Sequence, residues 1–456
     1  MLCYILYLYE IRPIGAKNEV LTMNTLKRMQ CLLLALILLL CTGCGGDKPA
    51  QTPAEEEKPA AETEQTATPD PQPEPEKEPE SKPEPAPAEK EEPKEDTRTL
   101  EEVINDVGEK YGAVGIQTAV VMDGELYGTY NYGWATLDKV AMTDDIRIRA
   151  ASISKIFVGV AAMIAMEDGY IDLDTDISEY WGEPIINPNH PTVPITIRSL
   201  LTHTSSLEDL DFTFSRSYEP VKEKLTTGKA FSKKKPGSTG AYEYNNFAYD
   251  VLAMTIEQAT GKWVDEILQE RFAIMELQGG YKQDGLNADN IATLYRENDI
   301  ACLTATSQAG YLRGSFPGSD GNNYAGGLTI SATDLSKLLI MLACDGVYEG
   351  QQLLSPESIE MMENATINTV TGYKQGLAIR LRNGYGRKGL YFHPGDAYGT
   401  FSLFAYDPAT RDGVVIVTTG GNEAGSYGNR TIYNEIATFA FKELDAVRAA
   451  ETSPEN

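Results

Sequence analysis

The sequence predicts an α+β fold: an antiparallel sheet flanked by terminal helices, with a mostly helical lobe inserted between its strands. Three observations support this prediction. Runs rich in β-forming residues lie near residues 117–130 and again within 376–419, the intervening stretch is helical in pattern, and helical runs occur at both ends of this region. Early and late strands around a helical middle indicate one sheet assembled from both ends of the folded region.

A helix and a hairpin open the folded region. Residues 101–111 have helical spacing of apolar side chains. The β-rich runs 117–122 and 125–130 then flank Asp123-Gly124. Because Asp-Gly favours the tight turn of a hairpin, these runs are predicted to pair as neighbouring strands.

Helices dominate the middle of the chain and strands return near its end. One apolar stripe, from Trp263 to Phe272, predicts a helix, and Asp334 to Ala343 begins another. Glycine, aspartate and proline then separate four short strand-like runs before a final helix. These runs are 376–381, 389–393, 399–406 and 413–419, and the final helix is expected at about 431–447.

The first 44 residues resemble an export signal. Lys27-Arg28 precedes the apolar run 31–40, which is too short to span a bilayer but typical of a secretion signal. The ending Cys41-Thr42-Gly43-Cys44 resembles a bacterial lipobox, so Cys44 is the expected site of lipid attachment and the first mature residue. An ordinary cleaved signal peptide or a short anchor is the alternative. Met23 would begin a signal of normal length, so either Met1 or Met23 is the start.

Residues 45–98 predict a disordered tether. The segment consists mainly of Pro, Glu, Ala, Lys and Thr and has no aromatic residue, so it cannot form a core. Its prolines favour an extended, semi-rigid spacer. The folded domain is then expected at 99–449, with a disordered tail at 450–456. The whole chain carries a net charge of −28, which argues against nucleic-acid binding.

Only two of the six cysteines, Cys302 and Cys344, belong to the expected folded domain. Export would permit a disulfide between them, but a buried free thiol at Cys344 fits its apolar surroundings equally well. The three histidines and the cysteines show no metal-ligand spacing. The sequence therefore predicts neither a metal site nor a cofactor.

The run 150–166 predicts a helix that is apolar nearly all round and carries one charge, Lys155. On a helix, Ser152 and Lys155 are three residues apart and lie on one face. Burial lowers the pKa of an ammonium group, so such a lysine can take a proton from a neighbouring hydroxyl. A serine at the helix start also has an outward backbone N–H that can stabilise an oxyanion. The alternative is a helix N-cap beside a snorkelling lysine.

A second Ser-x-x-Lys pattern serves as an internal comparison. Ser232-Lys233-Lys234-Lys235 is a run of lysines followed by Pro236-Gly237. Without apolar surroundings it predicts a solvated loop. The pattern alone is therefore weak, and its context decides the interpretation.

Three motifs follow one another along the chain: Ser152-Ile153-Ser154-Lys155, Tyr244-Asn245-Asn246 and His393-Pro394-Gly395. In this order and at these separations they resemble the Ser-x-x-Lys, Tyr-x-Asn and Lys/His-x-Gly motifs of the serine β-lactamase and DD-peptidase superfamily. The resemblance is closest to the branch of class C β-lactamases, D-Ala-D-Ala carboxypeptidases and related esterases. It spans residues 101–444, with further matches at 200–205 and 325–328, and implies the β-lactamase/transpeptidase-like fold.

The resemblance implies a role for each motif residue. Ser152 would be the acylated nucleophile, and Lys155 and Tyr244 would share general-base and general-acid work. Asn246 would bind the substrate amide or the Lys155 amine. His393 and Gly395 would lie on the strand that edges the site, and the backbone N–H groups of Ser152 and Asp396 would form the oxyanion hole. The resemblance leaves His203, near 200–205, a structural role at the close of a helical turn.

The third motif departs from that of true β-lactamases, which usually carry Lys-Thr-Gly. Histidine is largely neutral near pH 7, so His393 would bind a substrate carboxylate more weakly than lysine does. This departure argues against efficient β-lactam hydrolysis and leaves ester or peptide hydrolysis open. Pro394 has no N–H and must occupy a position where the sheet needs no donor.

Together these observations predict an exported, lipid-anchored serine hydrolase at the outer face of a bacterial membrane. Its expected partners are D-amino-acid peptides of the cell wall, or small esters or amides, and the membrane itself through the lipid. A protein that kept the fold but only binds wall peptides or another ligand is the alternative.

Overall fold

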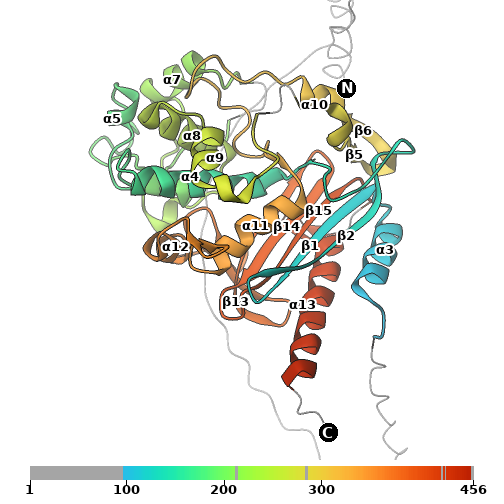
Figure 1. Ribbon diagram of the computed structural model, residues 1–456. Coiled ribbons are helices and arrows are strands. Elements are labelled where there is room, and N and C mark those ends of the chain that lie inside the picture. The colour runs from blue at the N-terminus through green and yellow to red at the C-terminus, as the bar shows by residue number, and fades with distance from the viewer. Residues whose placement is uncertain (1–95, 211–213, 283–285, 423–424, 427, 453–456) are drawn as a thin grey trace, which may run out of the picture. The chain divides into compact units, whose positions relative to one another are not determined.

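A nine-stranded antiparallel sheet forms the centre of the protein (Figure 1). The computed structural model describes residues 96–210, 214–282, 286–422, 425–426 and 428–452. The predicted signal and lipid site, the tether up to residue 95 and residues 453–456 lie outside these ranges. The strands, in spatial order, are β10 (Ile367–Asn368), β11 (Lys374–Gln375), β12 (Arg380–Gly384), β13 (Arg387–Ala397), β14 (Thr400–Asp407), β15 (Asp412–Thr419), β1 (Gly115–Met122), β2 (Glu125–Thr136) and β3 (Val140–Ala141).

Strands from both ends of the folded region meet in this sheet, which confirms the predicted fold class. The early strand β1 pairs along its length with the late strand β15, from Gly115 opposite Thr419 to Val121 opposite Gly413. At the β1–β2 turn, Asp123 and Gly124 have φ angles of 52° and 82°. Two positive φ angles match the twist of a two-residue hairpin, as the Asp-Gly pair predicts.

Both faces of the sheet are covered by helices (Figure 1). Along β15, Val415 and Val417 join the core beneath α11 (Ala332–Ala343), whereas Val414 and Ile416 point to the other face. There they pack against α3 (Leu100–Tyr111) and α13 (Thr431–Thr452). The alternation of side chains along a strand therefore builds two cores from one run of valine and isoleucine.

The inserted lobe is mainly helical and contains α4 (Ser154–Glu167), which packs against α8 (Asn246–Thr260) and α9 (Val264–Arg271). Short strand pairs interrupt the helices. One of them, β4 (Ile148–Arg149) with β7 (Thr329–Ile330), joins the start of α4 to the segment before α11.

The remaining helices of the described residues are α5 (Ser178–Trp181), α6 (Ile197–Leu201), α7 (Tyr218–Thr226), α10 (Ala305–Ala309) and α12 (Pro356–Glu363). The other strand pairs are β5 (Leu294–Arg296) with β6 (Ile300–Leu303), β8 (Val347–Tyr348) with β9 (Gln351–Gln352), and β16 (Gly425–Ser426) with β17 (Asn429–Arg430).

The strand predicted at 376–381 is wrong over most of its length. Residues 376–379 separate β11 from β12 and turn toward the helical lobe. The Leu377 N–H donates to Met362 O and the Ala378 N–H donates to Leu201 O, at 3.0 and 3.2 Å. These long-range bonds replace the strand ladder, and a single sequence gives no signal for them.

The last helix also differs from its predicted end. α13 continues to Thr452, so the first three residues of the predicted tail at 450–456 are helical. Alanine and glutamate at 449–451 are good helix formers, which explains the extension.

Cys302 and Cys344 are free thiols in the structure, so the alternative of a disulfide between them is not realised. The Cys302 thiol donates to Tyr398 O at 2.9 Å, near the first residue of β1. Cys344 ends α11 and lies against Gly124, beyond the last residue of β1. The eight residues of β1 separate the two places by about 25 Å, too far for a disulfide.

The ionic contact between β15 and α13 should be important for stability. Asp412 is fully buried and accepts from Arg387 at 3.0 Å and from Arg448 at 2.7 Å. Asp412→Ala should lower the free energy of unfolding by about 3–5 kcal/mol, because it removes the buried carboxylate that the two arginines share. Chemical denaturation measures this change. The exposed carboxylate Asp106, replaced by Ala, is the control and should leave the midpoint near that of the wild type.

Candidate active site

Ser152 sits in a short 3₁₀ turn, Ala151–Ile153, directly before α4. The sequence predicts one continuous helix from Ala150, and this detail is wrong. Ala151 has a φ of 50°, a left-handed conformation that is costly for any residue with a Cβ. Neighbouring contacts hold it: the Ala150 N–H donates to Leu328 O at 2.8 Å, and Ser154 Oγ donates to Ala151 O at 2.5 Å.

Lys155 is fully buried on the first turn of α4 and reaches three oxygen atoms. Its Nζ lies 3.3 Å from Ser152 Oγ, 2.8 Å from Asn246 Oδ1 and 2.6 Å from Ala325 O. The amide and carbonyl oxygens can only accept hydrogen bonds, whereas the hydroxyl can donate or accept. Of these three contacts, therefore, the one with Ser152 can carry a proton toward the amine.

The Tyr-x-Asn motif approaches Lys155 from the start of α8. The Tyr244 ring centroid is 4.9 Å from Lys155 Nζ, and Asn245 caps α8 by accepting from the Ala248 N–H at 2.7 Å. The next residue, Asn246, turns its Oδ1 to Lys155 and its Nδ2 to Asp209, at 2.9 Å. The cap therefore fixes the backbone positions from which the Tyr244 and Asn246 side chains project.

His203 supports this motif from the turn that follows α6. Its φ is 57°, and its Nδ1 accepts from the Asn245 N–H at 3.1 Å. The ring packs 4.6 Å from that of Tyr244. Burial first, and then the charges of Lys155 and Arg380, hold the pKa of His203 well below 6.5. A neutral ring that bonds to the backbone agrees with the structural interpretation.

The third motif lies on the edge of the sheet. β12 pairs with β13 only as far as Arg380 opposite Phe392, while β13 continues along β14 to Ala397. The His393–Asp396 stretch therefore has no β12 partner, so the missing N–H of Pro394 costs no bond on that side. A Cβ added at Gly395 would lie 2.1 Å from Ser402 Oγ and 2.8 Å from Ala150 O. Glycine therefore lets this strand lie close to the Ser152 segment.

His393 and Asp396 use their side chains elsewhere. His393 is 1% exposed and donates from Nδ1 to Pro394 O at 2.8 Å. Burial, followed by the charges of Arg380 and Lys155, holds the pKa of His393 well below 6.5. The Asp396 carboxylate pairs with Arg430 at 2.7 Å. His393 is thus neutral at pH 7, and the role predicted for Asp396 concerns its backbone N–H alone.

The sequence interpretation missed Arg380. The side chain is 4% exposed, and its Cζ lies 4.8 Å from the Tyr244 ring centroid and 4.5 Å from that of Tyr373. Its buried Nε has no hydrogen-bond partner, and within the described residues the guanidinium forms no ion pair. The one available signal was a charged residue in the otherwise apolar run 377–381. A buried cation without a counter-ion beside Tyr244 suits an anionic ligand.

The comparison motif behaves as predicted. Ser232 and Lys235 lie in a loop between α7 and α8, and Lys235 is exposed. Lys234 pairs at the surface with Glu243, at 2.8 Å. The two Ser-x-x-Lys sequences therefore differ in burial: Lys155 is buried and Lys235 is exposed.

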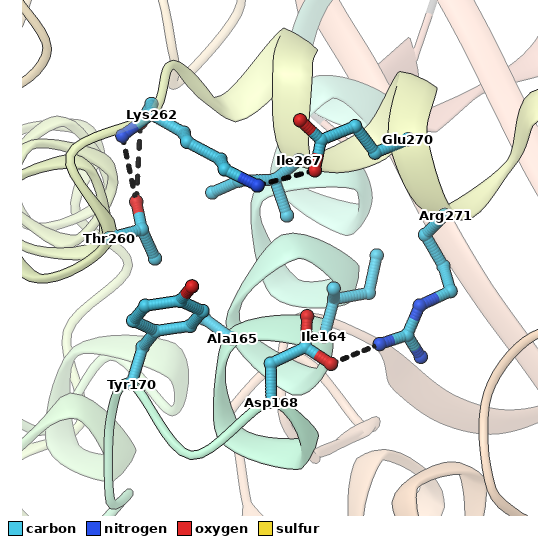
Figure 2. A pocket seen from close by; sticks show the side chains of 9 residues that line it. All are labelled: Ile164, Ala165, Asp168, Tyr170, Thr260, Lys262, Ile267, Glu270 and Arg271. Atoms are coloured by element: carbon cyan, nitrogen blue, oxygen red, sulfur yellow. Dashed lines mark hydrogen bonds and ion pairs between the residues drawn. The ribbon is translucent and has the colours of Figure 1, made fainter.

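A hollow on the helical lobe lies between the end of α4 and α9 (Figure 2). Its charged side chains already have partners: Lys262 bonds Glu270 at 2.5 Å, and Arg271 bonds Asp168 at 2.6 Å. Neither Ser152 nor Lys155 lines it. This hollow is therefore separate from the candidate site.

The described residues contain no cluster of three or more His, Cys, Asp or Glu side chains arranged to hold a metal ion. None of their helices combines the length and the apolar character needed to cross a membrane.

Comparisons with known proteins bear on this site. Residues 100–438 match the family described as Beta-lactamase. An unguisins hydrolase from Aspergillus campestris is 24% identical over 179 residues, 37% of this chain, but the match covers only 33% of that protein's length. Penicillin-binding protein 4 from Amycolatopsis lactamdurans is 23% identical over 73% of this chain and 88% of its own. The structure of D-amino acid amidase from Ochrobactrum anthropi SV3, complexed with L-phenylalanine amide, superimposes with a TM-score of 0.59 and 22% identity. It covers 76% of this chain and 98% of that chain.

The lowered pKa values of the buried histidines predict a pH effect on stability. The unfolded chain binds a proton near pH 6.5, and the folded chain does not. Each histidine therefore contributes stability above this pH that is lost as the pH falls. His203→Gln keeps an acceptor for the Asn245 N–H but cannot titrate. When the pH is lowered from 7.5 to 5.5, the free energy of unfolding of the wild type should therefore fall by about 1 kcal/mol relative to that of the variant. Denaturant titrations at both pH values measure it, and an unchanged difference would contradict neutral burial.

Proposed function

Since the chain belongs to the Beta-lactamase family, we propose that it is a serine hydrolase that acts through an acyl-enzyme on Ser152. The contact between Lys155 Nζ and Ser152 Oγ, 3.3 Å apart in a buried site, is the observation that carries this proposal. Members of this family include hydrolases, and the three motifs of the sequence meet around that contact.

The proposed reaction has two halves. Ser152 Oγ attacks the substrate carbonyl carbon while its proton moves to the Lys155 amine, and the N–H groups of Ser152 and Asp396 would hold the oxyanion. The bond to the leaving amine or alcohol then breaks, and that group takes a proton through Lys155 and Tyr244. Water attacks the resulting ester, and its proton returns Ser152 to the hydroxyl form as the acid product leaves.

A substrate with a free carboxylate fits the charges of the site best. His393 is neutral and cannot supply the cation that a Lys-Thr-Gly motif provides. Arg380 is buried and has no ion pair among the described residues, and its planar guanidinium can donate two parallel hydrogen bonds to a carboxylate. We therefore propose D-amino-acid peptides with a free C-terminus ahead of neutral esters or amides. The proposal of weak or no β-lactamase activity rests separately on the departure of the third motif from Lys-Thr-Gly.

We also propose an extracytoplasmic location. The signal-like segment and the lipobox-like Cys41-Thr42-Gly43-Cys44 support a lipid anchor at Cys44, and the proline-rich tether would let the domain reach wall peptides from the membrane surface. Metabolic labelling with a clickable palmitate, with and without Cys44→Ser, tests this location.

Labelling with a fluorophosphonate and with a fluorescent penicillin tests the acyl-enzyme. Wild-type protein should form a covalent adduct with at least one probe, because a buried amine beside Ser152 activates its hydroxyl. Ser152→Ala should lose the adduct entirely, whereas Ser232→Ala, in the comparison motif, should keep it. Absence of any adduct in folded wild-type protein would favour the alternative of a non-catalytic binding protein.

The carboxylate preference predicts a selective defect at Arg380. Arg380→Gln should reduce kcat/KM for a D-alanyl-D-alanine peptide about 10- to 100-fold, the loss of one charged hydrogen-bonding group. The same variant should change hydrolysis of a neutral nitrophenyl ester by no more than about 3-fold. The fold should survive, because the guanidinium has no ionic partner among the described residues to leave behind. Equal losses for both substrates would refute the carboxylate role.

A further inference from the structure

The two acceptors that face Lys155 besides Ser152 are each held by a carboxylate. Asn246, whose Oδ1 accepts from Lys155, donates from Nδ2 to Asp209 at 2.9 Å. Ala325, whose carbonyl accepts from Lys155 at 2.6 Å, donates its N–H to Asp250 Oδ1 at 3.1 Å. Each carboxylate therefore holds a residue whose oxygen accepts from the lysine.

One arginine joins the two carboxylates. Arg216 Nη1 hydrogen-bonds the other oxygen of Asp250, and Arg216 Nη2 lies 3.9 Å from Asp209. Arg216 is 6% exposed and Asp250 is fully buried on α8, one turn after Asn246. A third contact ties the same arginine to the Ala325 loop, because the Gly321 N–H donates to Arg216 O at 2.8 Å.

We propose that Asp250, Arg216 and Asp209 form a positioning network that aims the Lys155 amine at Ser152 Oγ by fixing Asn246 Oδ1 and Ala325 O, which both accept from the amine. This inference rests on the proposed acyl-enzyme function. None of the three residues is a catalytic residue, since each acts through Asn246 or Ala325. Asp250 is the decisive member, because it bridges the buried arginine and Ala325, the residue whose carbonyl makes the shortest of the three lysine contacts described above.

Electrostatics set the conditions for a test. Burial raises the pKa of Asp250 to about 7, while Arg216 and the Ala325 N–H oppose the rise. Besides Arg216, the charged group that acts on Asp250 from the facing helix is Lys155 of α4, and its influence also lowers this pKa. Assays at pH 8 therefore examine the ionised carboxylate.

The test replaces Asp250 with Asn in the full chain. An amide keeps an acceptor for the Ala325 N–H but loses the ionic bond to Arg216, so Ala325 O and the amine should shift. Ser152 acylation by a neutral nitrophenyl ester should slow about 10- to 100-fold, as expected when a reacting group is misplaced by roughly 1 Å. Dissociation constants for a D-amino-acid dipeptide, measured by calorimetry on the Ser152→Ala background, should stay within about 3-fold.

Asp412→Asn is the matched control, because it also removes a fully buried carboxylate from an ionic contact with arginine, here with Arg387 and Arg448, but at a place beneath α13. It should lower the melting temperature and leave the acylation rate unchanged. If Asp412→Asn slows acylation as much as Asp250→Asn does, general destabilisation explains the effect and the inference is overturned.

A double variant separates positioning from a merely structural role. If Asp250 acts only through Lys155, then Lys155→Met and Lys155→Met with Asp250→Asn should show the same residual acylation rate. A further loss in the double variant would contradict the network.

A crystal structure of Asp250→Asn decides the question without activity. The inference expects a longer distance between Lys155 Nζ and Ser152 Oγ than in the wild type, and an unchanged Lys155 geometry would overturn it. Should wild-type protein form no adduct with any probe, the proposed function fails, and this structural result still determines whether Asp250 positions the amine.

Discussion

The burial of the Lys155 amine away from water is the constraint on which the arrangement of the site depends. An ammonium or amine removed from water must find partners within the fold, or its burial costs several kcal/mol. Lys155 finds them in three parts of the chain: the 3₁₀ turn before its own helix at Ser152, the start of α8 at Asn246, and the loop before β7 at Ala325. Satisfying one side chain therefore brings together segments up to 170 residues apart. The second Ser-x-x-Lys sequence, 232–235, has no such requirement, because the amine of the exposed Lys235 can be solvated by water.

The charges around Tyr244 explain the unusual third motif. Lys155 and Arg380 both lie within 5 Å of the Tyr244 ring centroid, and both also face His393 and help keep it neutral. A lysine at position 393 would add a third cation to this buried cluster, where repulsion is poorly screened. Arg380 already places a positive charge beside Tyr244 from β12, so a neutral side chain at position 393 adds no further repulsion. The departure from Lys-Thr-Gly is thus coupled to a residue on the neighbouring strand.

Local patterns carried the prediction of the fold further than the prediction of the site. The Asp-Gly turn, the alternating valines of β15 and the apolar run after Ser152 each depend on neighbours in sequence, so the hairpin, the sheet strands and the helix could be foreseen. The left-handed Ala151 and the irregular 376–379 segment could not, because contacts with Leu328, Met362 and Leu201 impose them from distant parts of the chain. The three motifs brought Ser152, Lys155, Tyr244, Asn246 and His393 to attention. Arg380, Asp209 and Asp250 belong to no motif and acquire their meaning only from three-dimensional contacts.

The Ala325 carbonyl shows why a site of this kind needs support beyond the residues that touch the amine. A backbone oxygen cannot be replaced by mutation, so its position depends on what holds its own peptide and its neighbours. Asp250 holds the N–H of the same residue, and Arg216 holds Asp250 on one side and the Gly321 N–H on the other. The loop that contributes the carbonyl is thereby fastened to α8, the helix that also contributes Asn246. Both acceptors then move with one helix, and Lys155 on α4 needs only the packing of α4 against α8 to stay aimed at Ser152. Two packed helices hold their side chains in more fixed positions than a loop does. Attaching the Ala325 loop to α8 through Asp250 therefore gives the carbonyl a more rigid support.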